Sequence, residues 1–202
     1  MRTAATLLCL LTLSLSASPQ AIRTTTVNQI DQYAKSIDRI AGRRKEPDLI
    51  IADVSDYETD QPKWQRFKSS AELETFRETT ETYTIANNWR AKGKIVASLF
   101  TLFSPSGDWA QYVTHYFRPD GTAAKVITEM RTFNGDYIII RNMYFDVKGR
   151  LLKRTSKYLD LTSKKPKKPT AEMLDENSEF YKAEYYKTVV ALPFHSLTKT
   201  NL

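Results

Sequence analysis

The chain has 202 residues, a net charge of +7 at neutral pH and one cysteine, Cys9. A single cysteine excludes an internal disulfide, and this length suits one domain with its own hydrophobic core. Acidic residues outnumber basic ones over 46–81, and the reverse holds over 82–169, so we expect one surface to attract anions.

The first residues have the pattern of a secretory signal peptide. Arg2 supplies a short basic region, residues 4–15 are mostly apolar, and small residues follow at 16–18. The apolar run is shorter than the about 20 residues that a membrane span needs, and no longer run follows, so we do not expect an integral membrane protein. We expect residues 1–18 to be cleaved, a secreted or periplasmic location, and a single cysteine-free domain over 19–202.

A helix is predicted over residues 26–41, where apolar residues recur every three or four positions. Thr26 and Gln29 form a capping-box pattern at its start, and Gly42 is placed to end it. We expect its apolar stripe to pack on a sheet; packing on a membrane or a partner is the alternative.

A short strand is predicted over 48–54 and a short helix over 70–78. From residue 80 to 161 the chain is rich in Tyr, Thr, Ile, Val and Phe and is divided by turn signals such as Asn134-Gly135. The predicted fold class is therefore α+β, with a curled antiparallel β-meander of six or more long strands and the N-terminal helix packed on one face. Its strands are expected at 80–91, 94–104, 109–118, 122–133, 136–146 and 150–161.

The meander contains an internal repeat of 28 residues. GDWAQYVTHYF at 107–117 returns as GDYIIIRNMYF at 135–145, and each copy is followed by a turn glycine and a lysine at matching positions. A fainter copy of the turn, NNWRAKGKIVA, lies at 87–97. Each unit comprises two strands and two turns, so we interpret the repeat as architectural.

One of these turns, YFDVKGRL at 144–151, resembles the tyrosine–aspartate (YD-type) β-hairpin repeats of large secreted shell proteins. In those repeats Tyr-Asp is followed by Gly-Arg-Leu. The sister unit has YFRPDGTA instead. The resemblance implies a secreted β-hairpin structure and implies no particular activity.

Both faces of the predicted sheet carry large apolar side chains, whereas a half-solvated sheet alternates cleanly between apolar and polar residues. Either helices and another segment cover the two faces, or the sheet curls around a cavity. The candidate ligand-binding residues are those that alternation places together on one surface, where they would contact a lipid or another apolar or polymeric ligand. They are Tyr112, Tyr116, Ile140 and Tyr144; the alternative is that they are ordinary half-buried sheet residues.

The segment LTSKKPKKPT at 161–170 is a basic loop, in which Pro166 and Pro169 exclude a central strand. One helical turn is expected at 170–175, and residues 178–192 fit a helix or a last strand about equally. Four lysines of the loop are candidates for contact with an anionic envelope surface, and a solvated connector is the alternative. They are Lys164, Lys165, Lys167 and Lys168.

No catalytic or metal-binding motif is found in the sequence. His115 and His195 lack partners at ligand spacing, and nucleophile elbows and phosphate-binding glycine loops are missing. The acidic stretch 53–60 offers oxygen ligands but lacks the glycine of a calcium loop. We therefore expect no cofactor, no metal and no nucleic-acid partner.

These observations favour an exported, non-catalytic binding protein of the cell envelope or extracellular space that uses its aromatic sheet face. The second hypothesis is a structural or interaction module that docks on a protein partner or an anionic surface through the sheet and the lysine loop. A metal-independent hydrolase is the third.

Overall fold

The computed structural model describes residues 26–57, 59, 61–175 and 183–199. It contains three α-helices, α1 (Val27–Gly42), α2 (Ser70–Arg77) and α3 (Ala171–Leu174), and two 3-10 turns, η1 (Val189–Ala191) and η2 (His195–Lys199). Its strands are β1 (Leu49–Asp53), β2 (Trp64–Phe67), β3 (Thr84–Ala91), β4 (Lys94–Phe103), β5 (Trp109–Phe117), β6 (Ala123–Thr132), β7 (Tyr137–Phe145) and β8 (Leu151–Asp160).

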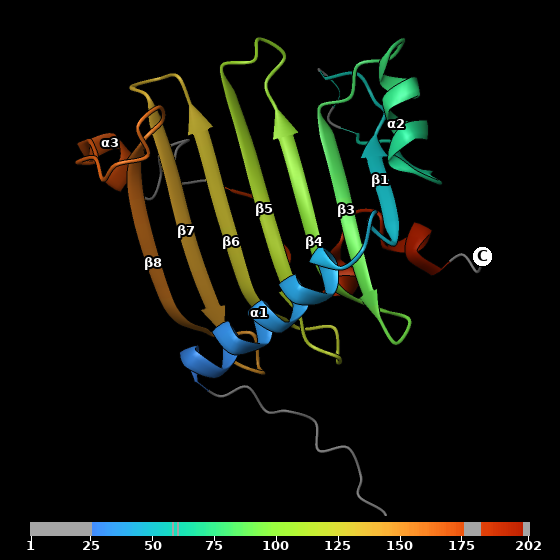
Figure 1. The fold of residues 1–202 in the computed structure, drawn as a ribbon, viewed down its shortest axis with the longest axis horizontal. Coiled ribbons are helices and arrows are strands. Elements are labelled where there is room, and N and C mark those ends of the chain that lie inside the picture. Colours follow the sequence, from blue (N-terminus) through green and yellow to red (C-terminus); the bar gives the residue numbers. More distant parts are fainter. Residues whose placement is uncertain (1–25, 58, 60, 176–182, 200–202) are drawn as a thin grey trace, which may run out of the picture.

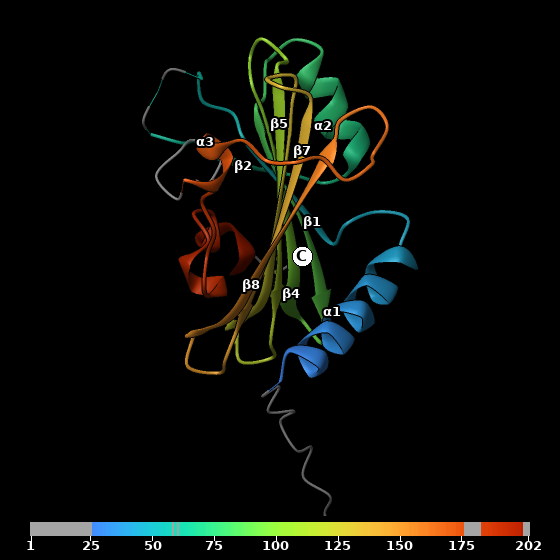
Figure 2. The same ribbon diagram turned by 90° about the vertical axis from the view of Figure 1, so that its left-hand side faces the viewer.

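All these strands form one open antiparallel sheet in the order β2-β1-β3-β4-β5-β6-β7-β8. Helices α1 and α2 lie on one face and the C-terminal segment lies on the other (Figure 1, Figure 2). The predicted α+β meander is confirmed. Within the described ranges, no helix has the length and apolar character needed to cross a membrane.

The strands β3 to β8 match the six predicted strands to within a few residues, and β1 matches the predicted short strand. Strand β2 was not predicted, because its four residues have no periodicity of their own. Its place is fixed by antiparallel pairing with β1, in which Phe67 lies opposite Ile50. Phe67 is buried against α2, which caps this edge of the sheet.

The 28-residue repeat corresponds to three successive hairpins, β3-β4, β5-β6 and β7-β8. Their turn glycines, Gly93, Gly121 and Gly149, have φ angles of 76°, 87° and 74°, which residues with a side chain seldom adopt. Each hairpin also shifts register just before its turn, at Trp89/Arg90, Tyr116/Phe117 and Tyr144/Phe145. The repeat is therefore a shared hairpin design with a bulge at the same position in the second and third hairpins and one residue later in the first.

Helix α1 lies across one end of the sheet, over β4 to β7 (Figure 1). The predicted capping box is present, since Gln29 N donates to Thr26 Oγ1 and Thr26 N donates to Gln29 Oε1. Gly42 is the last helical residue, and Arg43 rather than Gly42 forms the C-cap. The helix buries Ile30, Ala34 and Ile37 against the sheet.

The C-terminal segment, residues 183–199, covers the opposite face. Leu192 and Phe194 are almost fully buried against β-sheet residues such as Phe100 and Phe117. The predicted helix or strand over 178–192 is not observed in its described part, which has one bridge between Thr122 and Thr188 followed by η1. Residues 178–182 lie outside the described residues.

Candidate functional site

The four candidate ligand-binding residues lie on one face of the sheet, as alternation predicts. Lys125 of β6 lies between Tyr116 of β5 and Tyr144 of β7. Four residues further along β6, Glu129 lies between Tyr112 and Ile140 in the same way. This is the face that α1 covers. Tyr116 is 6% exposed and Tyr144 is 7% exposed, so a ligand could reach them only if α1 moved away.

Both buried tyrosines hydrogen-bond to α1. Tyr116 Oη donates to Asp38 Oδ1 at 2.8 Å, and Tyr144 Oη donates to Asp31 Oδ2 at 3.3 Å. Burial raises the pKa of Tyr116, and the hydrogen bond and negative charge of Asp38 raise it further. The phenol therefore stays protonated and serves as a donor that anchors the helix.

Tyr112 and Ile140 are half-buried and are not among the residues that cluster with the apolar stripe of α1. The Arg131 guanidinium lies 4.9 Å from the centroid of the Tyr112 ring. The described cavities are lined by other residues and do not include this pair. The structure therefore divides the four candidates into two residues that pack under α1 and two half-buried residues away from it.

His115 lies at the centre of the opposite face and is fully buried. Its Nε2 accepts a hydrogen bond of 3.0 Å from the backbone N of Tyr186, in the C-terminal segment. Burial lowers the pKa of His115 to about 4, and the nearby backbone carbonyls of Ser98 and Val113 offset this only in part. Its Nδ1 makes no well-formed hydrogen bond to any described residue. A neutral, inaccessible imidazole of this kind supports packing.

In the acidic stretch 53–60, Asp53 has a structural role. Asp53 Oδ1 accepts hydrogen bonds from Ser55 N at 3.0 Å and from Lys63 N at 2.8 Å, which closes the loop after β1. Glu58 and Asp60 lie outside the described residues. Among the residues that are described, no three His, Cys, Asp or Glu side chains gather closely enough to hold a metal ion.

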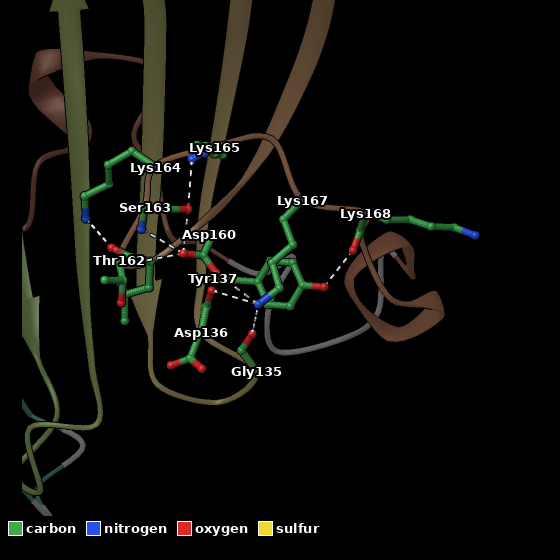
Figure 3. A network of polar contacts seen from close by, with 11 residues as sticks. Gly135, Asp136, Tyr137, Asp160, Thr162, Ser163, Lys164, Lys165, Lys167 and Lys168 are labelled. Carbon is green, nitrogen blue, oxygen red and sulfur yellow. Dashed lines mark hydrogen bonds and ion pairs between the residues drawn. The ribbon is translucent and has the colours of Figure 1, made fainter.

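The lysine loop is organised by Asp160, the last residue of β8 (Figure 3). Asp160 Oδ1 accepts hydrogen bonds from Ser163 N at 2.8 Å, from Ser163 Oγ at 2.9 Å and from Thr162 N at 3.2 Å. The backbone and hydroxyl of Ser163 lower the pKa of Asp160 to about 2, with smaller contributions from Thr162 and Lys167. The carboxylate is thus ionised and committed to the turn.

Lys167 differs from the other three candidate lysines because its side chain points into the molecule (Figure 3). Its Nζ donates to Gly135 O at 2.6 Å and lies 4.4 Å from the centroid of the Tyr137 ring. Tyr137 Oη in turn donates to Lys168 O at 2.6 Å. Lys167 therefore fastens the loop to the β6-β7 turn.

Lys164, Lys165 and Lys168 are exposed, and the loop that carries them is held in place. The backbone of the loop pairs with the end of β8, through a bridge between Leu159 and Pro166. Lys168 extends away from the polar network in Figure 3. A fixed loop offers these three charges to a partner at a smaller entropic cost than a flexible one.

Strand β8 continues this positive surface along the edge of the sheet. It is the outermost strand, and its first four residues are all exposed. Lys153 and Lys157 lie on the α1 face, opposite Tyr144 and Ile140, while Arg154 lies on the other face. We define the basic edge as Lys148, Lys153, Arg154, Lys157, Lys164, Lys165 and Lys168, all of which are exposed.

The segment 147–170, which carries the basic edge, is poor in acidic residues. Asp160 is the one acidic residue in the segment 147–170, and it is committed to the loop turn. Arg150 is excluded from the basic edge because its Nε lies 2.6 Å from Asp146 Oδ2. The lysine loop and the strand at 150–161 were both predicted, but the cations of that strand were not predicted to form a surface with the loop. A run of Lys and Arg in the last strand of a meander is typical of an exposed edge.

No family model matches the chain, and neither curated proteins nor solved structures yield a match. The function must therefore be inferred from the residues of this chain. Its exposed basic edge and its buried tyrosines are the features that separate the two leading hypotheses.

Proposed function

We propose that the protein is an exported docking module that binds an anionic membrane surface of the cell envelope through the basic edge. The observation that carries this proposal is the series of exposed cations along β8 and the lysine loop, whose one carboxylate is hydrogen-bonded within the loop turn. Anionic lipid head groups complement such a row. The signal-peptide pattern of residues 1–18 supports export.

The strength of such docking follows from simple electrostatics. Each Lys or Arg near an anionic membrane contributes about 1 kcal/mol, and the interaction decays over about 10 Å at 0.1 M salt. A strand rises about 3.3 Å per residue, so the cations of β8 and its loop are spread over a length of roughly 30 Å. They can act together if the edge lies along the membrane.

The hypothesis of a binding protein that uses its aromatic sheet face has less support than the docking hypothesis. Half of the proposed aromatic site is occupied by α1, and Tyr116 and Tyr144 already hydrogen-bond to it. The equivalent pair on the other face, Phe117 and Phe145, is buried under the C-terminal segment. Neither aromatic pair of the repeat is open to solvent.

Lysines on an edge strand also prevent sheets from pairing edge to edge. An experiment must therefore measure membrane binding and not solubility alone. We would measure sedimentation with vesicles of pure phosphatidylcholine and with vesicles that contain phosphatidylglycerol. The wild-type protein should bind the second and not the first, and added salt should weaken this binding.

The decisive variant carries Lys164→Glu, Lys165→Glu and Lys168→Glu. Loss of three contacts of about 1 kcal/mol each predicts at least about 100-fold weaker binding. The matched control carries Lys35→Glu, Lys45→Glu and Lys68→Glu, which changes the net charge equally at exposed positions away from the edge. Equal losses in the two variants, or equal wild-type binding to both kinds of vesicle, would contradict the proposal.

A further inference from the structure

The repeat places two arginines at equivalent positions on neighbouring hairpins. Arg90 follows the bulge of the β3-β4 hairpin, and Arg118 stands 28 residues later, next to the bulge of the β5-β6 hairpin. Because these hairpins are adjacent in the sheet, the two arginines lie at the same end of neighbouring hairpins, on β3 and directly after β5, with β4 between them. The proposed docking through β8 makes no use of them.

Between these two hairpin turns and the C-terminal segment lies a cleft of about 630 Å³. This volume is in the usual range for sites that bind small molecules. The cationic residues that line it are Arg90, Lys94, Arg118 and Lys199, and the acidic one is Asp120. Ile95, Val189 and Val190 form an apolar wall.

The cations of the cleft are held in place by carbonyl groups. Arg118 is 3% exposed and donates to Ala123 O and Phe145 O, both at 2.6 Å. Lys94 Nζ donates to Pro119 O at 2.8 Å. Four cationic residues and one acidic residue line the cleft, so the cleft has a positive potential.

Arg90 is bound on one side only. Its Nη2 donates to Thr198 O at 2.7 Å, whereas its buried Nε hydrogen-bonds none of the described residues. Described carboxylates form no ion pair with Arg90, Lys94 or Lys199. Asp120 is engaged in its own turn, where Oδ1 accepts from the N and Oγ1 of Thr122 at 2.9 and 2.7 Å.

The third hairpin shows the same design without the cleft. Its residue equivalent to Arg118 is Asp146, which pairs with Arg150 of the same turn and is thereby neutralised. Val190, in contrast, is 69% exposed beside the cationic cleft and is unusually accessible for an apolar side chain. An amphiphilic anion would complement both the charge and this wall.

We propose that the cleft binds a small organic anion, whose phosphate or carboxylate group lies among Arg90, Lys94 and Lys199. Its apolar part packs on Val189 and Val190. The inference does not depend on membrane docking, because the cleft and the lysine loop are formed by opposite ends of the hairpins.

The test uses two soluble probes, hexyl phosphate and inorganic phosphate, titrated into the full-length protein. Calorimetry should show that hexyl phosphate binds about tenfold more tightly, since its chain covers the apolar wall. Lys94→Gln with Lys199→Gln should weaken the binding of both probes about tenfold or more, because these exposed lysines supply charge without supporting the core. Lys35→Gln with Lys68→Gln, at two exposed positions outside the lining of the cleft, is the matched control and should change nothing.

Glycine amide signals in nuclear magnetic resonance spectra give a readout that needs no variant. Hexyl phosphate should shift the amides of Gly93 and Gly121, which line the cleft, and leave that of Gly149 unchanged. Three results would each overturn the proposal: no heat of binding for either probe, equal shifts at all three glycines, or equal losses in the lysine variant and the control.

Discussion

The two faces of the sheet are covered in different ways. On one face α1 is a regular helix whose apolar stripe packs on the strands while Asp31 and Asp38 at its border receive hydrogen bonds from Tyr144 and Tyr116. On the other face the described C-terminal segment has 3-10 turns and is held by buried apolar side chains and by the hydrogen bond from Tyr186 N to His115. Backbone hydrogen bonds to Gly121 and Ala123 hold it further. The hydrogen bonds of Tyr116 and Tyr144 to α1 lie at the edge of the helix. The hydrogen bond between the C-terminal segment and His115 lies in the core.

This difference has consequences for how each cover responds to change. A polar contact near solvent is worth little and is readily replaced by water. A polar contact in the core is surrounded by groups that cannot replace it, so its loss is costly. We therefore expect the C-terminal cover to be the more sensitive to truncation and to acid.

The largest effect is expected for Phe194→Ala. Phe194 is 1% exposed and lies 5.2 Å from the Trp64 ring and 5.5 Å from the Phe100 ring, centroid to centroid. Its truncation should lower the free energy of unfolding by about 4 kcal/mol, because it leaves a cavity in the main core. Ile30→Ala under α1 should cost about 3 kcal/mol. Denaturant titration measures both, and a larger loss for Ile30→Ala would reverse the comparison.

The second effect is a loss of stability in mild acid. The pKa of His115 is about 4 in the folded protein, whereas an unperturbed histidine, as in the unfolded chain, has a pKa of 6.5. Between these two pH values the imidazole is therefore more protonated in the unfolded chain than in the folded protein. The contribution of neutral His115 is complete above pH 6.5 and is lost as the pH falls toward 4, by roughly 3 kcal/mol in total. Protonation also removes the acceptor for Tyr186 N.

The matched variant for this effect is His115→Gln, whose side chain can accept from Tyr186 N but does not titrate. Its free energy of unfolding should change less between pH 6.5 and 4 than that of the wild-type protein. Asp160, with a pKa of about 2, loses its contribution only below pH 4 and should not disturb this window. Parallel pH profiles for the two proteins would show that His115 is not the sensitive group.

The smallest effect is expected at the border of α1. Tyr116→Phe removes the hydroxyl that donates to Asp38 but keeps the ring that packs under the helix. We expect a loss of about 1 kcal/mol, since Asp38 is exposed and can be hydrated instead. A double-mutant cycle with Asp38→Asn would isolate the contact, and a coupling well above this value would place it with the buried contacts.

The candidate sites show where sequence reasoning reached its limit. Alternation placed Tyr116 and Tyr144 on one face, but alternation cannot tell which face a helix will cover. The lysine loop was visible in the sequence, yet only the fold showed that Lys167 turns inward to Gly135 O while Lys168 stays outside. The cleft between Arg90 and Lys199 joins residues more than 100 positions apart, and no local pattern predicts such a meeting.

The sequence by itself determined the hairpins, their turns and the start of α1. These features depend on contacts within a few residues: glycines that accept positive φ, alternation along a strand, and a capping box at Thr26. Tertiary structure decided the rest, including the place of β2, the covering of the tyrosines and the open edge at β8. Those outcomes depend on which apolar surfaces find each other across the chain, and burial of apolar area has no preferred sequence separation.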